Sequence, residues 1–142
     1  MLNFIRGLSE SIKPAFITQM HFAALKSLAD AEIVATRDEL PDELATLAAA
    51  IPVHHHLKPP PEVLDDAFEP DILGLFVGPP HGENTGHGND VPAQILLFLG
   101  NLWEFAEADE TAFLDEVRIT YLHELGHYFG WDEDDLAARD LD

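Results

Sequence analysis

The segment HELGHYFGWDE, residues 123–133, decides how the rest of the chain is interpreted. It overlaps the end of an amphipathic run over residues 111–129 that predicts a helix. On a helix, His123 and His127 lie one turn apart and about 40° apart around the axis, so both imidazoles can reach one tetrahedral Zn²⁺. Glu124 leans over the same face, where a carboxylate can contact the metal's water without binding the metal. The segment therefore predicts a zinc-binding helix that also carries a general base.

The third zinc ligand is expected just after this helix. Gly130 lies where the helix must stop, because glycine takes the left-handed conformation at a helix end without a Cβ penalty. A reversal of the chain there can return an acid toward the metal. We expect one zinc per chain, held by His123, His127 and Glu133. The competing acids nearby are Asp132, Asp134 and Asp135.

The order of apolar segments along the chain indicates the fold class. Helical spacing or helix-start signals mark residues 18–37, 42–50 and 111–129. Apolar runs predict buried strands at residues 72–77 and 94–99, and residues 53–57, bounded by prolines, are a further short strand candidate. Residues 78–92 are too rich in Gly and Pro for regular structure and form a long loop. Helices on either side of a small sheet indicate an α+β fold.

Length and composition indicate a single domain. The 142 residues match the usual size of one domain, and 46% of them are hydrophobic, which is enough for a core. We expect residues 1–17 to be an N-terminal extension that need not be ordered, and residues 18–142 to form the domain. No cysteine is present, which excludes thiolate-ligated metals, thiol nucleophiles and disulfides. The sequence contains neither a long apolar run nor a secretory signal. We therefore expect a cytoplasmic protein that does not associate with membranes.

The chain is strongly acidic. Its 27 acidic and 7 basic residues give a formal net charge of −20. This balance argues against nucleic acid as a partner, because phosphate binding requires clustered Lys and Arg. We favour solubility or adaptation to salt as the role of the charge over electrostatic attraction of basic substrates.

Several residues around the predicted site have two interpretations. Thr120 and Glu116 lie on the histidine face one and two turns earlier and can orient the zinc ligands, although a solvated or capping role suits Glu116 equally well. The predicted core stripe of the helix is Leu114, Val117, Tyr121, Leu125 and Tyr128 or Phe129. The sequence shows no evident residue to stabilise the oxyanion. Four polar residues of the Gly-rich loop could do so, but we favour a polar lid as their role. These loop groups are His81, Asn84, His87 and Asn89.

A second histidine cluster, His54-His55-His56, falls in the first predicted strand. Successive strand residues alternate between faces, so at most His54 and His56 share one side. That pair has no obvious third ligand, and we favour strand-edge histidines over a metal site.

The motif formed by His123, Glu124, His127, Gly130 and Glu133 resembles the extended zincin motif of metzincins, H-E-x-x-H-x-x-G-x-x-H/D. The chain is similar to the minimal zincin family of small bacterial metallopeptidases, in which an acid fills the last place. The similarity covers residues 22–135, including ILGLFVG (72–78), PAQILLF (92–98) and DEVRITYLHELGHYFG (115–130). The resemblance implies a compact zincin-like metallopeptidase domain with one catalytic zinc, in which a small mixed sheet packs against the active-site helix.

The chain also departs from larger zincins. Metzincins place a methionine turn after the third ligand, but the only methionines here are Met1 and Met20. Thermolysin-type zincins take the third ligand from a second helix some twenty residues further on, beyond the last residue of this sequence. The third ligand is therefore expected within residues 131–142 or upstream, and the motif register favours Glu133, although the family more often has Asp there.

These features predict a zinc-dependent peptidase that acts on a peptide or protein. Zinc-bound water would attack the scissile carbonyl, with Glu124 as the general base that passes the proton to the leaving amine. Two alternatives remain: a zinc-organised interaction module with little or no catalysis, and a zinc hydrolase of a non-peptide amide. Glu124 favours an enzyme, because a purely structural zinc site needs no base.

Overall fold

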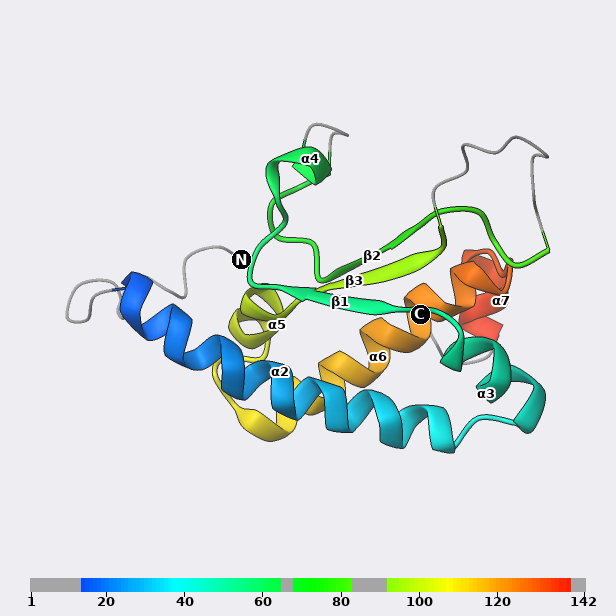
Figure 1. Ribbon diagram of the computed structural model, residues 1–142, viewed down its shortest axis with the longest axis horizontal. Coiled ribbons are helices and arrows are strands. Elements are labelled where there is room, and N and C mark those ends of the chain that lie inside the picture. The colour runs from blue at the N-terminus through cyan, green and yellow to red at the C-terminus, as the bar shows by residue number, and fades with distance from the viewer. Residues whose placement is uncertain (1–13, 65–67, 83–91, 139–142) are drawn as a thin grey trace.

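The computed structural model of the chain consists of three strands and the helices that cover them (Figure 1). It describes the backbone of residues 14–64, 68–82 and 92–138, and the side chains of these ranges except at residues 14–21, 133, 136 and 137. The elements in chain order are α2 (Pro14–Asp38), α3 (Asp42–Ala49), β1 (Val53–His56), α4 (Pro61–Leu64), β2 (Gly74–Val77), β3 (Gln94–Phe98), α5 (Leu99–Phe105), α6 (Glu110–Tyr128) and α7 (Glu133–Ala138).

The strands form one mixed sheet in the order β1-β3-β2. β1 runs parallel to β3, with Val53 opposite Ile95, and β2 runs antiparallel to β3, with Phe76 opposite the same Ile95. β3 is therefore the central strand, and β1 and β2 are the edges of the sheet within the described part of the chain. The predicted α+β fold with a small mixed sheet is confirmed, and each strand ends within two residues of its predicted limits.

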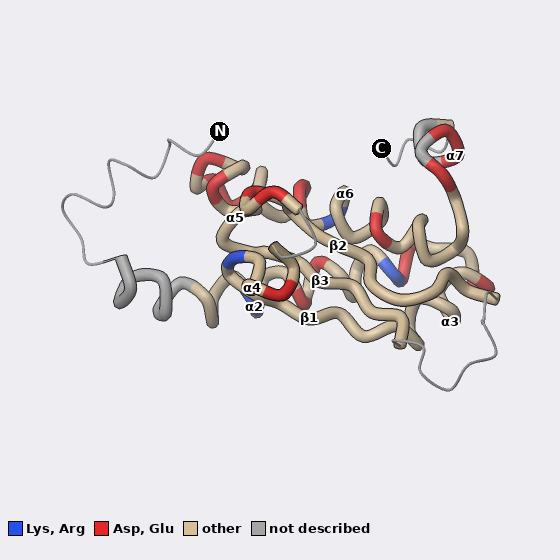
Figure 2. The backbone as a smooth tube through the Cα atoms, turned by 90° about the horizontal axis from the view of Figure 1, so that it is seen from above, with Lys and Arg blue, Asp and Glu red and all other residues tan. Residues whose placement is uncertain are grey.

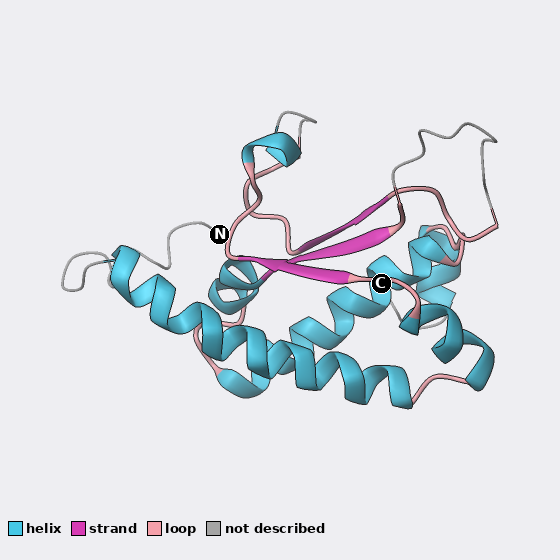
Figure 3. Cartoon of the chain, in the orientation of Figure 1, coloured by secondary structure: helices cyan, strands magenta, loops and turns pink. Residues whose placement is uncertain are grey.

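The two faces of β3 are buried by different parts of the chain. Ile95 and Leu97 are fully buried in the larger core, which α2, α5 and α6 complete. Leu96 and Phe98 point the other way and pack with Val63 of α4 in a smaller cluster. Figure 3 shows most of the helices on one side of the strands. This near-continuous burial explains why the sequence of β3 is an unbroken apolar run.

Helix α6 supplies the main contact between the sheet and the helical layer. Asp109 caps its start, accepting a hydrogen bond from the Ala112 amide at 2.8 Å. The helix buries its predicted stripe residues Val117, Tyr121 and Leu125. Its other buried residues are Phe113, Thr120, Leu122 and Gly126.

The first turn of α6 differs from the prediction. Leu114 is only half-buried, and the neighbouring Phe113 is fully buried instead. The reason is α5, which the sequence analysis did not predict. Trp103 of α5 meets Phe113 edge-on, with ring centroids 5.6 Å apart and planes at 75°. This contact draws the first turn toward α5.

The other differences concern short elements and one boundary. α4 and α7 were not predicted, because four and six residues are too few to show a helical period. α2 begins at Pro14 and not at residue 18, and proline is well suited to a first helical turn. Most of the expected extension over residues 1–17 lies outside the described residues.

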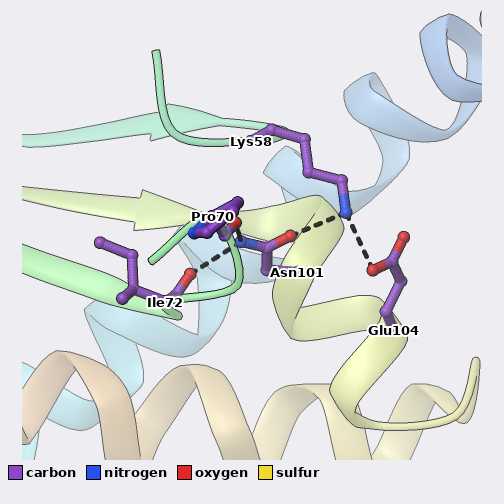
Figure 4. Close-up of polar contacts among 5 residues, drawn as sticks. All are labelled: Lys58, Pro70, Ile72, Asn101 and Glu104. Carbon is purple, nitrogen blue, oxygen red and sulfur yellow. Dashed lines mark hydrogen bonds and ion pairs between the residues drawn. The ribbon is translucent and has the colours of Figure 1, made fainter. Parts of the chain in front are cut away.

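Buried Asn101 of α5 anchors the segment that leads into β2 (Figure 4). Its side-chain amide nitrogen donates hydrogen bonds to the carbonyl oxygens of Pro70 and Ile72, each at 2.8 Å. Its amide oxygen accepts a 2.8 Å hydrogen bond from Lys58, which also pairs with Glu104 at 2.8 Å. One side chain therefore connects the chain after β1, helix α5 and the start of β2.

We predict that Asn101→Leu lowers the free energy of unfolding by about 2 to 4 kcal/mol, because it leaves two partly buried carbonyl groups without a donor. Lys58→Arg should cost less than about 1 kcal/mol, because it keeps a cation for Asn101 and for Glu104, whose side chain is only 10% exposed. Urea denaturation of both variants measures the two effects. Equal losses would show that the amide of Asn101 is not the anchor.

Candidate active site

A groove of about 280 Å³ opens between α6 and the residues that lead into β2. One wall comes from the β2 side, and the other comes from about two and a half turns of α6. The lining residues are Ile72, Leu73 and Gly74, and Glu116, Ile119, Thr120, His123 and Glu124. The groove therefore contains two residues of the predicted zinc helix motif, together with both residues that the sequence placed on the same face.

The groove depends on a close approach between β2 and α6 at Gly74. A Cβ atom on Gly74 would lie 2.7 Å from Thr120 Cγ2 and 3.2 Å from the carbonyl oxygen of Leu96. No side chain fits at the first of these distances without displacing a neighbour. Glycine here allows the strand to lie directly on the histidine face of the helix.

The two histidines of the motif lie side by side on this face. The ring centroids of His123 and His127 are 4.8 Å apart, with the ring planes at 82°. Both side chains are half-buried. Two imidazoles one turn apart and partly shielded from water are a suitable donor pair for zinc, whose tetrahedral sites are commonly built on His nitrogens.

The end of α6 is closed by the turn that the sequence predicted at Gly130. Gly130 has φ +85°, in the left-handed region. Its amide donates to the carbonyl of His127, and the amide of Trp131 donates to the carbonyl of Gly126, each at 3.0 Å. This pair of hydrogen bonds defines a Schellman motif, which satisfies the last carbonyls of the helix and reverses the chain.

The reversed chain enters α7 through a second pair of local hydrogen bonds. The Asp135 amide donates to Asp132 Oδ1 at 2.8 Å, and the Asp132 amide donates to Asp135 Oδ2 at 3.0 Å. This reciprocal arrangement is a capping box. Two of the three competitors for the third ligand position therefore already serve the backbone, while the third, Asp134, is exposed.

Glu133 is the first residue of α7, and its side chain lies outside the described residues. Among the side chains that are described, no group of three His, Asp or Glu converges as a metal site. The described part of the site thus fits zinc through the chemistry and spacing of its two imidazoles, and the third ligand stays a prediction.

At the C-terminal end of α6, Tyr128 and His81 form a pair that the sequence analysis did not predict. The backbone amide of His81 donates to the Tyr128 carbonyl at 2.6 Å, and the Tyr128 hydroxyl lies 3.3 Å from His81 Nδ1. Tyr128 also packs against Phe76 of β2, with ring centroids 5.9 Å apart. The loop after β2 is thereby fixed to the end of α6. The other loop groups considered from the sequence, Asn84, His87 and Asn89, lie outside the described residues.

The histidines of β1 are divided between the two faces of the sheet, as strand geometry predicts. His54 is exposed, and the ring of His56 packs near Phe98 at 6.2 Å. The His55 side chain is only 2% exposed, and its Nε2 lies 2.8 Å from Asp30 Oδ1 of α2. Burial lowers the pKa of His55, while Asp30 acts in the opposite direction. His55 therefore has a structural role, because its contact with Asp30 joins β1 to α2.

Comparison with known proteins agrees with this architecture. Residues 48–142, more than half of the chain, match the family described as zincin-like metallopeptidase. The chain therefore belongs to this family, and its resemblance to minimal zincins is confirmed. Among curated proteins, none matches the chain. In the described ranges, no helix combines the length and apolar character needed to cross a membrane.

We predict that Gly74→Ala lowers the free energy of unfolding by about 1 to 3 kcal/mol, because the added methyl group overpacks the contact with Thr120. In a Thr120→Ser background, which lacks the opposing methyl group, the same change should cost clearly less. Thermal or urea unfolding of the two single variants and the double variant completes the cycle. Strict additivity would contradict a direct contact between these positions.

Proposed function

We propose that the chain is a zinc-dependent peptidase whose active site is the histidine face of α6 beside the start of β2. The observation that carries the proposal is the groove in which His123 and Glu124 lie together, with the His127 ring 4.8 Å from that of His123. Membership of the zincin-like metallopeptidase family supports it. A peptide or protein substrate and a cytoplasmic location remain predictions from the sequence.

In this proposal, His123, His127 and Glu133 hold the metal. Zinc, when bound, supplies a Lewis acid that polarises a water molecule and the scissile carbonyl. The two imidazoles must be neutral to act as ligands. Both imidazoles are half-buried on one helix, which restricts the directions in which they can point. The Schellman motif reverses the chain after the helix, and Glu133 follows six residues after His127.

Glu124 is the proposed general base. It lies in the groove next to His123 but is offset by one residue around the helix, so its carboxylate can face the attacking water without being a ligand. It accepts a proton from this water as the new C–O bond forms. It then delivers the proton to the leaving amine nitrogen as the scissile C–N bond breaks.

The edge strand β2 gives the substrate a place to bind. Its only strand partner in the described part of the chain is β3, and its first residue, Gly74, lines the groove beside Glu124. An extended peptide can add to such an edge through backbone hydrogen bonds. This mode of binding would lay a substrate along the histidine face of α6.

We predict that elemental analysis of protein purified without added metal finds one zinc per chain, and that His123→Ala/His127→Ala abolishes it. Glu133→Ala should lose most of the zinc, because three protein ligands are usual in a catalytic zinc site. The matched control is Asp134→Ala, which removes the same charge from the next residue and should keep the metal.

The metal assay also tests the remaining acids. Asp132→Asn preserves a good capping side chain and should keep the zinc. Stoichiometric zinc in the double histidine variant would refute the ligand assignment and direct attention to His54 and His56. Equal zinc loss in Asp134→Ala and Glu133→Ala would refute the specific role of Glu133.

We predict that Glu124→Gln keeps its zinc and its fold but hydrolyses peptides about two to four orders of magnitude more slowly, since a positioned acid–base group contributes about this much. The measurement is turnover of a mixed pool of unstructured peptides near neutral pH, with a chelator control. Wild-type cleavage should be measurable but slow, because a small open groove offers few subsites.

Two outcomes would overturn this assignment. Equal, chelator-sensitive turnover in wild type and Glu124→Gln would exclude Glu124 as the base. No turnover in either protein, with full zinc content, would instead favour a zinc-organised interaction module or a hydrolase of non-peptide amides.

A further inference from the structure

The groove beside His123 has a carboxylate at its end that no cation neutralises within the described part of the chain. Glu116 is half-buried, and neither an ion pair nor a hydrogen bond joins its side chain to another described residue. Burial, and to a lesser degree the neighbouring Asp115, raise the pKa of Glu116. A partly desolvated acid of this kind gains more from an incoming cation than a hydrated surface acid does.

Three of the four Lys and Arg side chains that the structure describes form ion pairs elsewhere. Lys26 pairs with Asp30, Lys58 with Glu104 and Arg118 with Glu39, and Arg37 lies close enough to Tyr121 to act on its hydroxyl. Arg118 is the nearest in sequence to Glu116, but it reaches across to the end of α2. Along the described backbone, Figure 2 shows acidic positions in red at several places and only a few basic positions in blue.

The walls of the groove are apolar where they approach Glu116. Ile72 and Leu73 line the β2 side, and Ile119 lines the α6 side. Ile119 is 43% exposed, although it is a large apolar residue. A groove with apolar walls and a carboxylate at its end matches a side chain with a long methylene stem and a cationic tip, because such side chains bury the stem and keep the charge at a polar site.

The position of Glu116 relates it to the proposed site of cleavage. It precedes His123 by seven residues, which is about two helical turns, so it lies on the same face about 10 Å along the axis. An extended peptide advances about 3.3 Å per residue. A substrate residue about three positions from the cleaved bond, or a nearer one with a long side chain, therefore reaches this carboxylate.

We propose that Glu116 selects peptide substrates that carry a lysine or arginine within about three residues of the cleaved bond. The stem of that side chain packs against Ile72 and Ile119, and its cation pairs with the Glu116 carboxylate. This inference rests on the proposed peptidase function and names its substrate class. The net charge of −20 alone would attract basic substrates to the whole surface, whereas this proposal assigns the preference to one groove.

The test uses a peptide that the wild-type enzyme cleaves and two matched versions of it. One version carries arginine near the cleaved bond, and the other carries citrulline, which has nearly the same shape without the charge. We expect kcat/KM to favour arginine by about tenfold, as for a hydrogen-bonded ion pair that is partly shielded from water. Mass spectrometry identifies the cleaved bond, and the preference should hold on one side of it.

Variants then distinguish the effect of Glu116 on the arginine preference from the effect of the protein's overall charge. Glu116→Gln should reduce the arginine preference to about one, mainly by raising KM for the arginine peptide. Asp115→Asn removes the same charge from the adjacent exposed residue and should leave the preference near tenfold. Glu116→Lys should invert the preference in favour of a peptide with glutamate at that position.

Each outcome decides the inference. Equal loss of preference in Asp115→Asn and Glu116→Gln would assign the effect to overall charge and overturn it, as would the absence of a preference in wild type. If no peptide is cleaved, the peptidase proposal fails, and calorimetric binding of the same two peptides to the zinc-loaded protein tests Glu116 alone. Tighter arginine-peptide binding that Glu116→Gln abolishes supports the groove, and equal or undetectable binding of both peptides overturns it.

Discussion

The contact between Gly74 and Thr120 is the constraint on which the site depends. A larger residue at position 74 would force β2 or Thr120 to shift, because its Cβ atom would lie 2.7 Å from Thr120 Cγ2. The segment before Gly74 is fixed from behind by Asn101, whose amide holds the carbonyls of Pro70 and Ile72. One wall of the groove is thereby positioned at both ends. The other wall is a single rigid helix, so the groove keeps its shape without a second domain.

The turn after α6 bears on the proposed third zinc ligand, because it reverses the chain directly after the helix that carries the two histidines. The Schellman motif ends the helix at once, and the capping box of Asp132 and Asp135 starts α7 immediately afterwards. Both devices are local hydrogen-bond patterns and need no support from distant residues. They also occupy two carboxylates that would otherwise compete with Glu133.

Local signals in the sequence predicted the features that local physics determines. Gly130, the acidic start of α6 and the three strands were all identified, because each has a signal in its own short stretch of sequence. Helix α5 was missed because it continues the apolar run of β3 without a polar break, and its N-cap Phe98 makes no side-chain capping bond. Because α5 was not predicted, its contact with Phe113 was not predicted either, and Leu114 was assigned to the core in place of Phe113. The Gly74–Thr120 approach and the Asn101 anchor join residues 46 and 31 positions apart (120 − 74 and 101 − 70), and no single-sequence pattern encodes such pairs.

The strong negative charge then has two effects that differ in range. Exposed carboxylates attract basic partners from a distance, but salt screens this attraction beyond about 8 to 10 Å, and each exposed pair contributes little once formed. The proposed pairing of Glu116 with a substrate cation acts at contact, in a groove whose walls reduce the hydration of the carboxylate, so salt would weaken this interaction much less. Adaptation to salt and a preference for basic substrates are therefore compatible in one protein. Under the proposal, high salt would remove the general attraction and leave selection to Glu116, about two helical turns from His123 in the same groove.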